Sequence, residues 1–237
     1  MRPSVLQLRQ FYSSRLGRSV KKRLRQRVRA LWPELGNDTV LGIGYAPPLL
    51  RVLDRQAGGA IMALMPADQG AVYWPVHTDN RSVLGDELMP PLAPNRLERV
   101  LVVHAFEFLP RPDELLRVYW EMLSPGGRVL LIVPNRRGVW ARLGATPFAR
   151  GTPYSVAHLK ELVAAAQFTL RDCTTSLYAR SDSLWWEWLG RAIAPGWGGV
   201  IVLEAEKQIY AGISVPAESR RAMWKPAPMP VTERNGA

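Results

Sequence analysis

Short apolar runs alternate along the chain with stretches long enough for amphipathic helices, and this alternation limits the fold more than any other feature. The runs occupy residues 39–43, 60–64, 99–104 and 128–133. Strands joined by helix-length connections pair in parallel, because the right-handed crossover places each helix on a face of the sheet. The pattern therefore predicts an α/β fold in which these four strands lie parallel and adjacent, with helices on both faces.

The second half of the chain continues the pattern and then changes it. A helical stretch begins at Asp113 and ends at the Ser-Pro-Gly-Gly turn of residues 124–127. A second helix over 155–167 leads into an apolar run at 168–178, and another run follows at 198–210. Two strands in succession predict an antiparallel C-terminal hairpin at the edge of the sheet.

The net charge of +11 is concentrated at one end of the chain. Residues 1–33 contain ten Arg and Lys side chains and no acid, which leaves 21 basic and 20 acidic side chains over residues 34–237. A nucleic-acid-binding domain spreads positive charge over its folded surface, so nucleic acid is the less favoured partner. The single cysteine, Cys173, argues against a disulfide framework and against a zinc site that needs several thiolates.

The basic segment has the pattern of an amphipathic helix. Leu16, Val20, Leu24 and Val28 recur every four residues, and the pattern ends near Trp32. The apolar stripe either packs on the domain, or enters the surface of an anionic membrane to which the bases are attracted. An Arg-rich segment without acids is also typical of an organelle transit peptide.

These features divide the chain into three parts. They are a basic helix over 1–33, an α/β domain over 34–212 and a Pro-rich tail over 213–237. No apolar run reaches the roughly 18 residues that cross a bilayer. We expect a cytoplasmic protein, with peripheral membrane association through residues 1–33.

One stretch of sequence resembles a known family. The segments PPLAPNRLERVLVVHAFEF and DELLRVYWEMLSPGGRVLLIVPN resemble class I S-adenosylmethionine-dependent methyltransferases, in particular the branch that methylates quinones and other small molecules. The resemblance implies a Rossmann-like, seven-stranded, mostly parallel sheet with S-adenosylmethionine bound across the carboxyl ends of the first strands. It also implies a small-molecule or lipid-like methyl acceptor.

The first cofactor motif of that family departs from its usual form here. The family has an acid and three alternating glycines after its first strand, which let the backbone approach the cofactor closely. The corresponding positions are Gly42, Gly44, Ala46 and Pro48, with Tyr45 between the second and third. A proline is tolerated in the first turn of the helix that follows.

The second motif is also altered, whereas the third is present. Met65 stands where the family has the acid that binds the ribose hydroxyls, and a thioether is a poor hydrogen-bond acceptor. Asp86 stands where the family places the acid that meets the adenine amine. We therefore expect weak or absent cofactor binding, and expect Met65→Asp or Met65→Glu to tighten it.

His104 and Glu107 are the candidate catalytic residues. His104 ends an expected strand beside the implied cofactor site, and Glu107 follows three residues later, so the pair could orient or deprotonate a hydroxyl acceptor. The alternative is that both side chains only pack or cap. His77 and His158 have no partners at metal-ligand spacing, so no metal is expected.

The segment 134–155 contains no acid and follows an expected strand at the ligand end of the sheet. Trp140 and Phe148 offer apolar area for an acceptor, and basic side chains in the same segment would attract an anion. These bases are Arg136, Arg137, Arg142 and Arg150.

A tryptophan cluster near the end of the chain indicates either core or a face that binds a protein partner. It contains Trp185, Trp186 and Trp188. Two functions remain open: an active methyltransferase, or a methyltransferase-fold scaffold subunit that has lost cofactor binding.

Overall fold

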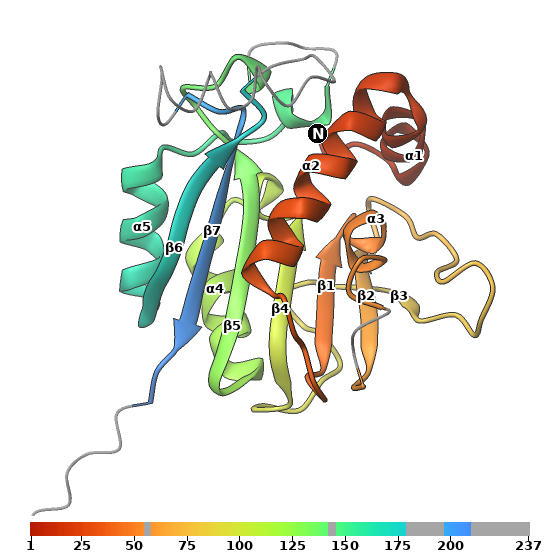
Figure 1. Cartoon of the computed structure of the whole chain (residues 1–237). Helices are drawn as coiled ribbons and strands as arrows, with labels where there is room; N and C mark the ends of the chain where they lie inside the picture. Colours follow the sequence, from red (N-terminus) through yellow and green to blue (C-terminus); the bar gives the residue numbers. More distant parts are fainter. Residues whose placement is uncertain (55–57, 142–145, 179–196, 210–237) are drawn as a thin grey trace, which may run out of the picture.

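The computed structural model describes residues 1–54, 58–141, 146–178 and 197–209, which form a seven-stranded sheet with helices on both faces (Figure 1). The strand order is β3-β2-β1-β4-β5-β7-β6. The strands are β1 (Val40–Gly44), β2 (Ile61–Pro66), β3 (Ser82–Gly85), β4 (Leu97–Val103), β5 (Leu123–Pro134), β6 (Phe168–Ser176) and β7 (Val200–Lys207).

The expected sheet is confirmed. The four strands predicted from the apolar runs are neighbours in the order β2-β1-β4-β5, and each neighbouring pair is parallel. β7 pairs antiparallel with β6, which confirms the expected hairpin at the edge, and it also pairs antiparallel with β5. β3 was not predicted, because its four residues include only one that is buried and give no periodic signal.

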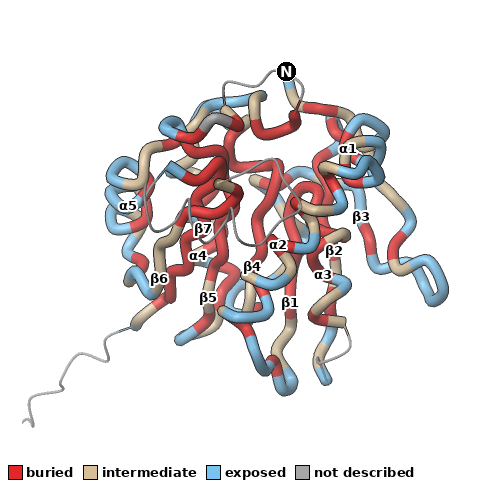
Figure 2. The backbone as a smooth tube through the Cα atoms, turned by 45° about the horizontal axis from the view of Figure 1, so that its top comes forward, coloured by how far each residue is buried: buried red, intermediate tan, exposed pale blue. Residues whose placement is uncertain are grey.

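Helices cover the two faces of the sheet unequally. α2 (Arg15–Leu31) crosses the face toward the viewer in Figure 1, and α1 (Val5–Ser13) and α3 (Pro47–Leu50) contribute to the same apolar cluster. α4 (Pro112–Met122) and α5 (Val156–Ala165) pack on the opposite face. Figure 2 shows buried residues along the central strands between these layers. Three short 3-10 turns complete the described elements: η1 (Phe106–Phe108), η2 (Val139–Ala141) and η3 (Pro147–Ala149).

The apolar stripe of the basic segment faces the sheet. Val20, Leu24 and Val28 are at most 2% exposed, and each buried aliphatic side chain contributes about 1.5 to 3 kcal/mol to folding. Trp32, just after α2, is also buried, and its Nε1 donates to Glu204 of β7 at 2.7 Å. α2 is therefore part of the core, and its apolar face does not reach a membrane.

α1 and α2 share one capping residue. The Ser14 N–H donates to the carbonyls of Gln10 and Phe11 at the end of α1, and its hydroxyl accepts from Gly17 N at 3.0 Å at the start of α2. The sequence predicts one helix over 1–33, and the structure instead divides this segment at Ser14 into two helices. α1 begins at a capping box formed by Ser4 and Gln7.

Candidate functional site

The carboxyl ends of β1, β2 and β4 meet at one edge of the sheet. Strand order reverses there, because β2 lies on one side of β1 and β4 on the other. Open α/β sheets bind ligands in the crevice at such a reversal. Gly44, Met65 and His104 lie at the ends of these three strands, so the expected cofactor and catalytic residues gather at this edge.

The loop after β1 packs closely against β4 and α3. Gly44 has φ +78°, and a Cβ there would lie 2.2 Å from the Val103 carbonyl oxygen. A Cβ on Gly42 would lie 2.5 Å from that of Ala46. The Tyr45 N–H donates to the same Val103 carbonyl at 2.9 Å. Both glycines are therefore required by packing within the protein itself, whether or not a ligand approaches.

The ends of β2 and β3 place the two remaining cofactor candidates. Met65 is completely buried, and its Sδ accepts a long hydrogen bond from the Val72 N–H at 3.5 Å. Asp86 is exposed and accepts from the Leu88 N–H at 2.9 Å, within its own loop. The neighbouring Glu87 is the acid that points into the protein.

His104 and Glu107 lie together, as the sequence predicts. His104 Nδ1 is 3.3 Å from Glu107 Oε1, and both side chains are completely buried. His104 Nε2 lies 2.9 Å from the hydroxyl oxygen of Tyr12 in α1. Sequence reasoning missed Tyr12, because 92 residues separate it from His104 and no local pattern links the two.

Tyr12, His104 and Glu107 form a chain of buried groups between which protons can be shared. Burial raises the pKa of Tyr12 well above its ordinary value, and the nearby Tyr45 and Glu107 raise it further, so its hydroxyl stays protonated. Tyr12 can then donate to His104 Nε2 while Nδ1 carries a proton that faces Glu107. Because Tyr12 is only 3% exposed and covers the imidazole, an acceptor reaches His104 only if Tyr12 moves.

The N-terminal residues are tied to the ends of β2 and β3. Arg2 donates to Asp68 Oδ1 at 3.0 Å and forms an ion pair with Glu87, and both members of that pair are nearly buried. The Arg2 guanidinium also lies 5.6 Å from the centre of the Phe108 ring. The first residues of the chain thus connect the three segments that follow β2, β3 and β4.

The same contacts continue into α1. The Val5 N–H donates to the Gln69 carbonyl at 2.7 Å, and Gln69 Nε2 donates to the His104 carbonyl at 3.1 Å. Tyr12 stacks on Tyr45 with the ring centres 5.6 Å apart. Residues 2–12 therefore cover the edge at which the strand order reverses.

The segment after β5 supplies an aromatic wall. Phe148 lies 4.7 Å from the His104 ring and 6.2 Å from Trp140, measured between ring centres, and both aromatic residues are buried. Arg136 and Arg137, which were expected to meet an anionic acceptor, are exposed. Other residues singled out from the sequence lie outside the described residues: Arg142, Trp185, Trp186 and Trp188.

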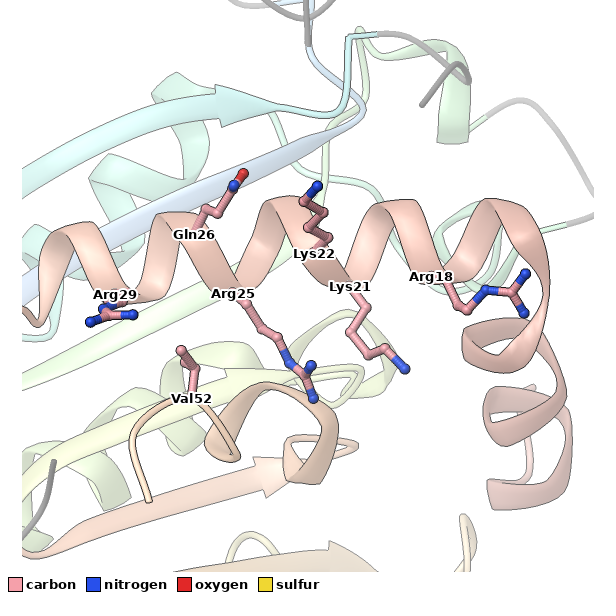
Figure 3. Close-up of a pocket in the computed structure, with 7 residues that line it drawn as sticks. All are labelled: Arg18, Lys21, Lys22, Arg25, Gln26, Arg29 and Val52. Carbon is pink, nitrogen blue, oxygen red and sulfur yellow. The ribbon is translucent and has the colours of Figure 1, made fainter. Parts of the chain in front are cut away.

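A cavity of about 560 Å³ opens beside the edge, between α1, the start of α3 and residues 71–76. Its volume is within the usual range for small-molecule sites. Tyr12 and Tyr45 are in its wall, together with basic side chains described below. A groove of about 240 Å³ adjoins it along α2 and shares Lys21 and Arg25 with it (Figure 3).

Within the described residues, no group of three or more His, Cys, Asp or Glu side chains could hold a metal ion. None of the helices in this part of the chain is both long and apolar enough to span a membrane.

Comparison with known proteins identifies related sequences and folds, although no family model matches the chain. A ubiquinone biosynthesis O-methyltransferase of Xanthomonas euvesicatoria pv. vesicatoria (strain 85-10) is 26% identical over 170 residues, which are 67% of this chain and 71% of that protein.

Solved structures share the fold at lower identity. A Thermotoga maritima S-adenosylmethionine-dependent methyltransferase, described as a possible histamine N-methyltransferase, matches 86% of this chain and 96% of its own, with a TM-score of 0.63 and 16% identity. A second such methyltransferase, from Archaeoglobus fulgidus, matches 84% of this chain and 96% of its own, with a TM-score of 0.59 and 18% identity.

A third structure was solved with ligands. It is the geranyl diphosphate C-methyltransferase of Streptomyces coelicolor A3(2), in complex with Mg²⁺, geranyl diphosphate and S-adenosyl-L-homocysteine. It matches 77% of this chain and 79% of its own, with a TM-score of 0.56 and 14% identity. The chain therefore shares the fold of class I S-adenosylmethionine-dependent methyltransferases, and its sequence is similar to that of a curated O-methyltransferase.

Proposed function

We propose that the chain is an S-adenosylmethionine-dependent methyltransferase that acts on a small or lipid-like acceptor at a membrane surface. The observation that carries this proposal is the reversal of strand order between β1 and β4, with the glycine turn at Gly44 and the buried His104 on either side of it. The 26% identity to a ubiquinone biosynthesis O-methyltransferase supports it. The cofactor would supply the methyl group, and the protein would hold the acceptor in line with it.

The proposed base is His104. Glu107 positions its imidazole from the Nδ1 side, and Tyr12 holds the Nε2 side until an acceptor hydroxyl replaces it. Phe148 packs against the imidazole and keeps water from it. This arrangement suits an acceptor that must lose a proton when it is methylated.

The side chains do not fit the cofactor in the arrangement described here. Met65 offers no carboxylate to the ribose and is buried, while Tyr45 and His104 are covered by Tyr12. Binding at this edge therefore requires residues 1–13 to move away from it. No methyl-transfer step is therefore assigned to the arrangement in which residues 1–13 cover the edge.

Calorimetric titration with S-adenosylhomocysteine tests the proposal. Arg2→Ala removes the ties to Asp68 and Glu87, so it should bind the ligand more tightly than the native chain. Arg111→Ala is the matched control, because Arg111 pairs with Glu114 at the exposed start of α4. If all three proteins are folded by circular dichroism and none binds the ligand, the proposed function is rejected.

A scaffold subunit is the second candidate function. The observation that favours it is the nearly buried Arg2–Glu87 pair, which holds the N-terminal residues over the edge where a cofactor would bind. In the same titration, a scaffold would show no binding even after Arg2→Ala. Restored binding would exclude it.

A further inference from the structure

The cavity beside α1 gathers four cationic side chains from three segments. Arg9 comes from α1, Lys21 and Arg25 from α2, and Arg51 follows α3. Among the described residues that line the cavity, none is acidic. The hydrogen bonds that Lys21 and Arg25 donate go to the main-chain carbonyls of Tyr12 and Pro48, at 3.4 and 2.6 Å, so they leave the positive charge uncompensated.

These cations repel one another. Burial lowers the pKa of Lys21, and the charges of Arg25, Arg51 and Arg18 lower it further. Burial and the charge of Arg51 likewise lower the pKa of Arg25. An anion in the cavity would remove this repulsion, and the planar guanidinium groups suit the oxygens of a phosphate.

Three large apolar side chains are exposed at the mouth of the same cavity. Leu6, Tyr73 and Val76 line it and are 71%, 60% and 72% exposed, respectively. Large apolar side chains that gather on a surface usually mark a site of interaction. Exposed and partly buried cations beside exposed apolar side chains match an amphiphile that has an anionic head and an apolar body.

We propose that this cavity binds the phosphate headgroup of an anionic membrane lipid, while Leu6, Tyr73 and Val76 enter the lipid surface. The inference rests on the proposed activity at a membrane surface and identifies where that surface is contacted. The buried stripe of α2 cannot make the contact, so the contact is assigned to the end of the molecule formed by α1 and residues 71–76.

The groove along α2 extends the positive surface away from the cavity. Figure 3 shows Lys21 and Arg25 projecting from the side of α2 that faces Val52, with Arg18 and Arg29 on α2 toward its two opposite ends. These bases add attraction to an anionic surface without selecting a particular headgroup. Selection is assigned to the cavity, where the cations and the apolar mouth meet.

Sedimentation with vesicles tests the cationic part. Native protein should sediment with phosphatidylcholine vesicles that contain phosphatidylglycerol and not with phosphatidylcholine alone. Arg9→Gln with Arg51→Gln should lower the partition coefficient about thirtyfold, since each base near an anionic surface contributes about fivefold. The control, Arg117→Gln with Lys160→Gln, changes the net charge equally on exposed positions of α4 and α5, and should bind as the native protein does.

A second pair of variants tests the apolar mouth. Leu6→Gln with Val76→Gln should weaken vesicle binding and leave a fraction that high salt releases more easily. Leu170→Gln with Ile209→Gln replaces exposed apolar side chains elsewhere and should have no effect. All four substituted positions are at least 39% exposed, so the variants should keep the native thermal midpoint.

The same proteins titrated with inorganic pyrophosphate and glycerol 3-phosphate distinguish a lipid from a soluble ligand. The inference is wrong, and the ligand is soluble, if three results are found together. These compounds bind the native protein, the variant with Arg9→Gln and Arg51→Gln (the cavity variant) does not bind them, and the native protein does not sediment with vesicles. Equal vesicle binding by the cavity variant and its control would also overturn it. Since no cofactor is present in these assays, their failure leaves the S-adenosylhomocysteine titration unaffected.

Discussion

Tyr12 and His104 form a buried hydrogen bond of 2.9 Å between the first helix of the chain and the end of β4. No sequence pattern singles out Tyr12, whereas His104 is the candidate base that the sequence predicts. Because the bond is enclosed, the free energy of unfolding should report on it directly.

Tyr12→Phe should destabilise the protein by about 1 to 3 kcal/mol, because it leaves His104 Nε2 buried without a partner. Urea unfolding measures the change. Tyr73→Phe is the control, since the hydroxyl of Tyr73 donates to Thr78 in an exposed loop and its loss should change stability by less than about 0.5 kcal/mol. Equal effects of the two substitutions would contradict the prediction.

Stability should fall as the pH rises above about 10. Burial raises the pKa of Tyr154 to about 12 and that of Tyr12 well above its ordinary value of 10.0. Between pH 10 and 12 the unfolded chain releases tyrosine protons that the folded chain keeps, so stability is complete below pH 10 and is lost above it. The loss is about 1.4 kcal/mol per pH unit for each retained proton.

Urea unfolding at several pH values from 9 to 11 measures this slope. Tyr154→Phe should make it shallower, whereas the exposed Tyr73→Phe should leave it unchanged. If Tyr154→Phe leaves the slope as it is in the native protein, Tyr154 does not retain its proton and the prediction is wrong.

Met65→Asp should destabilise the protein rather than restore a cofactor contact. The sequence alone recommends this substitution, but Met65 is completely buried among apolar side chains. An unpaired carboxylate there should cost about 4 kcal/mol or more. Met65→Leu, which keeps an apolar side chain of similar volume, should cost less than about 1.5 kcal/mol. A stable Met65→Asp protein would show that the end of β2 opens to water.

Gly44→Ala should cost more than Gly126→Ala, although both glycines have φ +78°. A Cβ at Gly126 meets nothing within 4 Å, so only the left-handed backbone is strained, at about 1 to 2 kcal/mol. At Gly44 the added Cβ would also lie 2.2 Å from the Val103 carbonyl oxygen. Chemical denaturation of the two variants measures the difference, and equal costs would mean that the β1 loop relaxes without loss.

The sheet was predictable because its central strands are continuous apolar runs. The second parts of β4 and β5, residues 100–103 and 129–133, are buried, and they divide between the two apolar clusters, so every position there carries the signal. β3 is an edge strand with two exposed apolar residues, Val83 and Leu84, and no alternation to reveal it. α1 carries a capping box, Ser4 and Gln7, and Ser14 caps α2, so these serines are the signals that could have divided the predicted helix in two.

The site was predictable only within single segments. His104 and Glu107 are three residues apart, so local spacing brought them together correctly. Asp86 is exposed, whereas the neighbouring Glu87 turns inward and pairs with Arg2, which is 85 residues away. Such long-range pairing has no local sequence signal, and the same is true of the contact between Gln69 and His104.

The single capping residue between α1 and α2 has a consequence for ligand affinity. Ser14 joins the two helices directly, and α2 is fixed in the core. When α1 leaves the edge, it therefore stays close to it. Residues 1–13 then act as an intramolecular competitor whose effective concentration is of millimolar order. Under the proposed function, the affinity of the full chain for its cofactor is the intrinsic affinity of the open edge multiplied by the fraction of time that α1 is displaced.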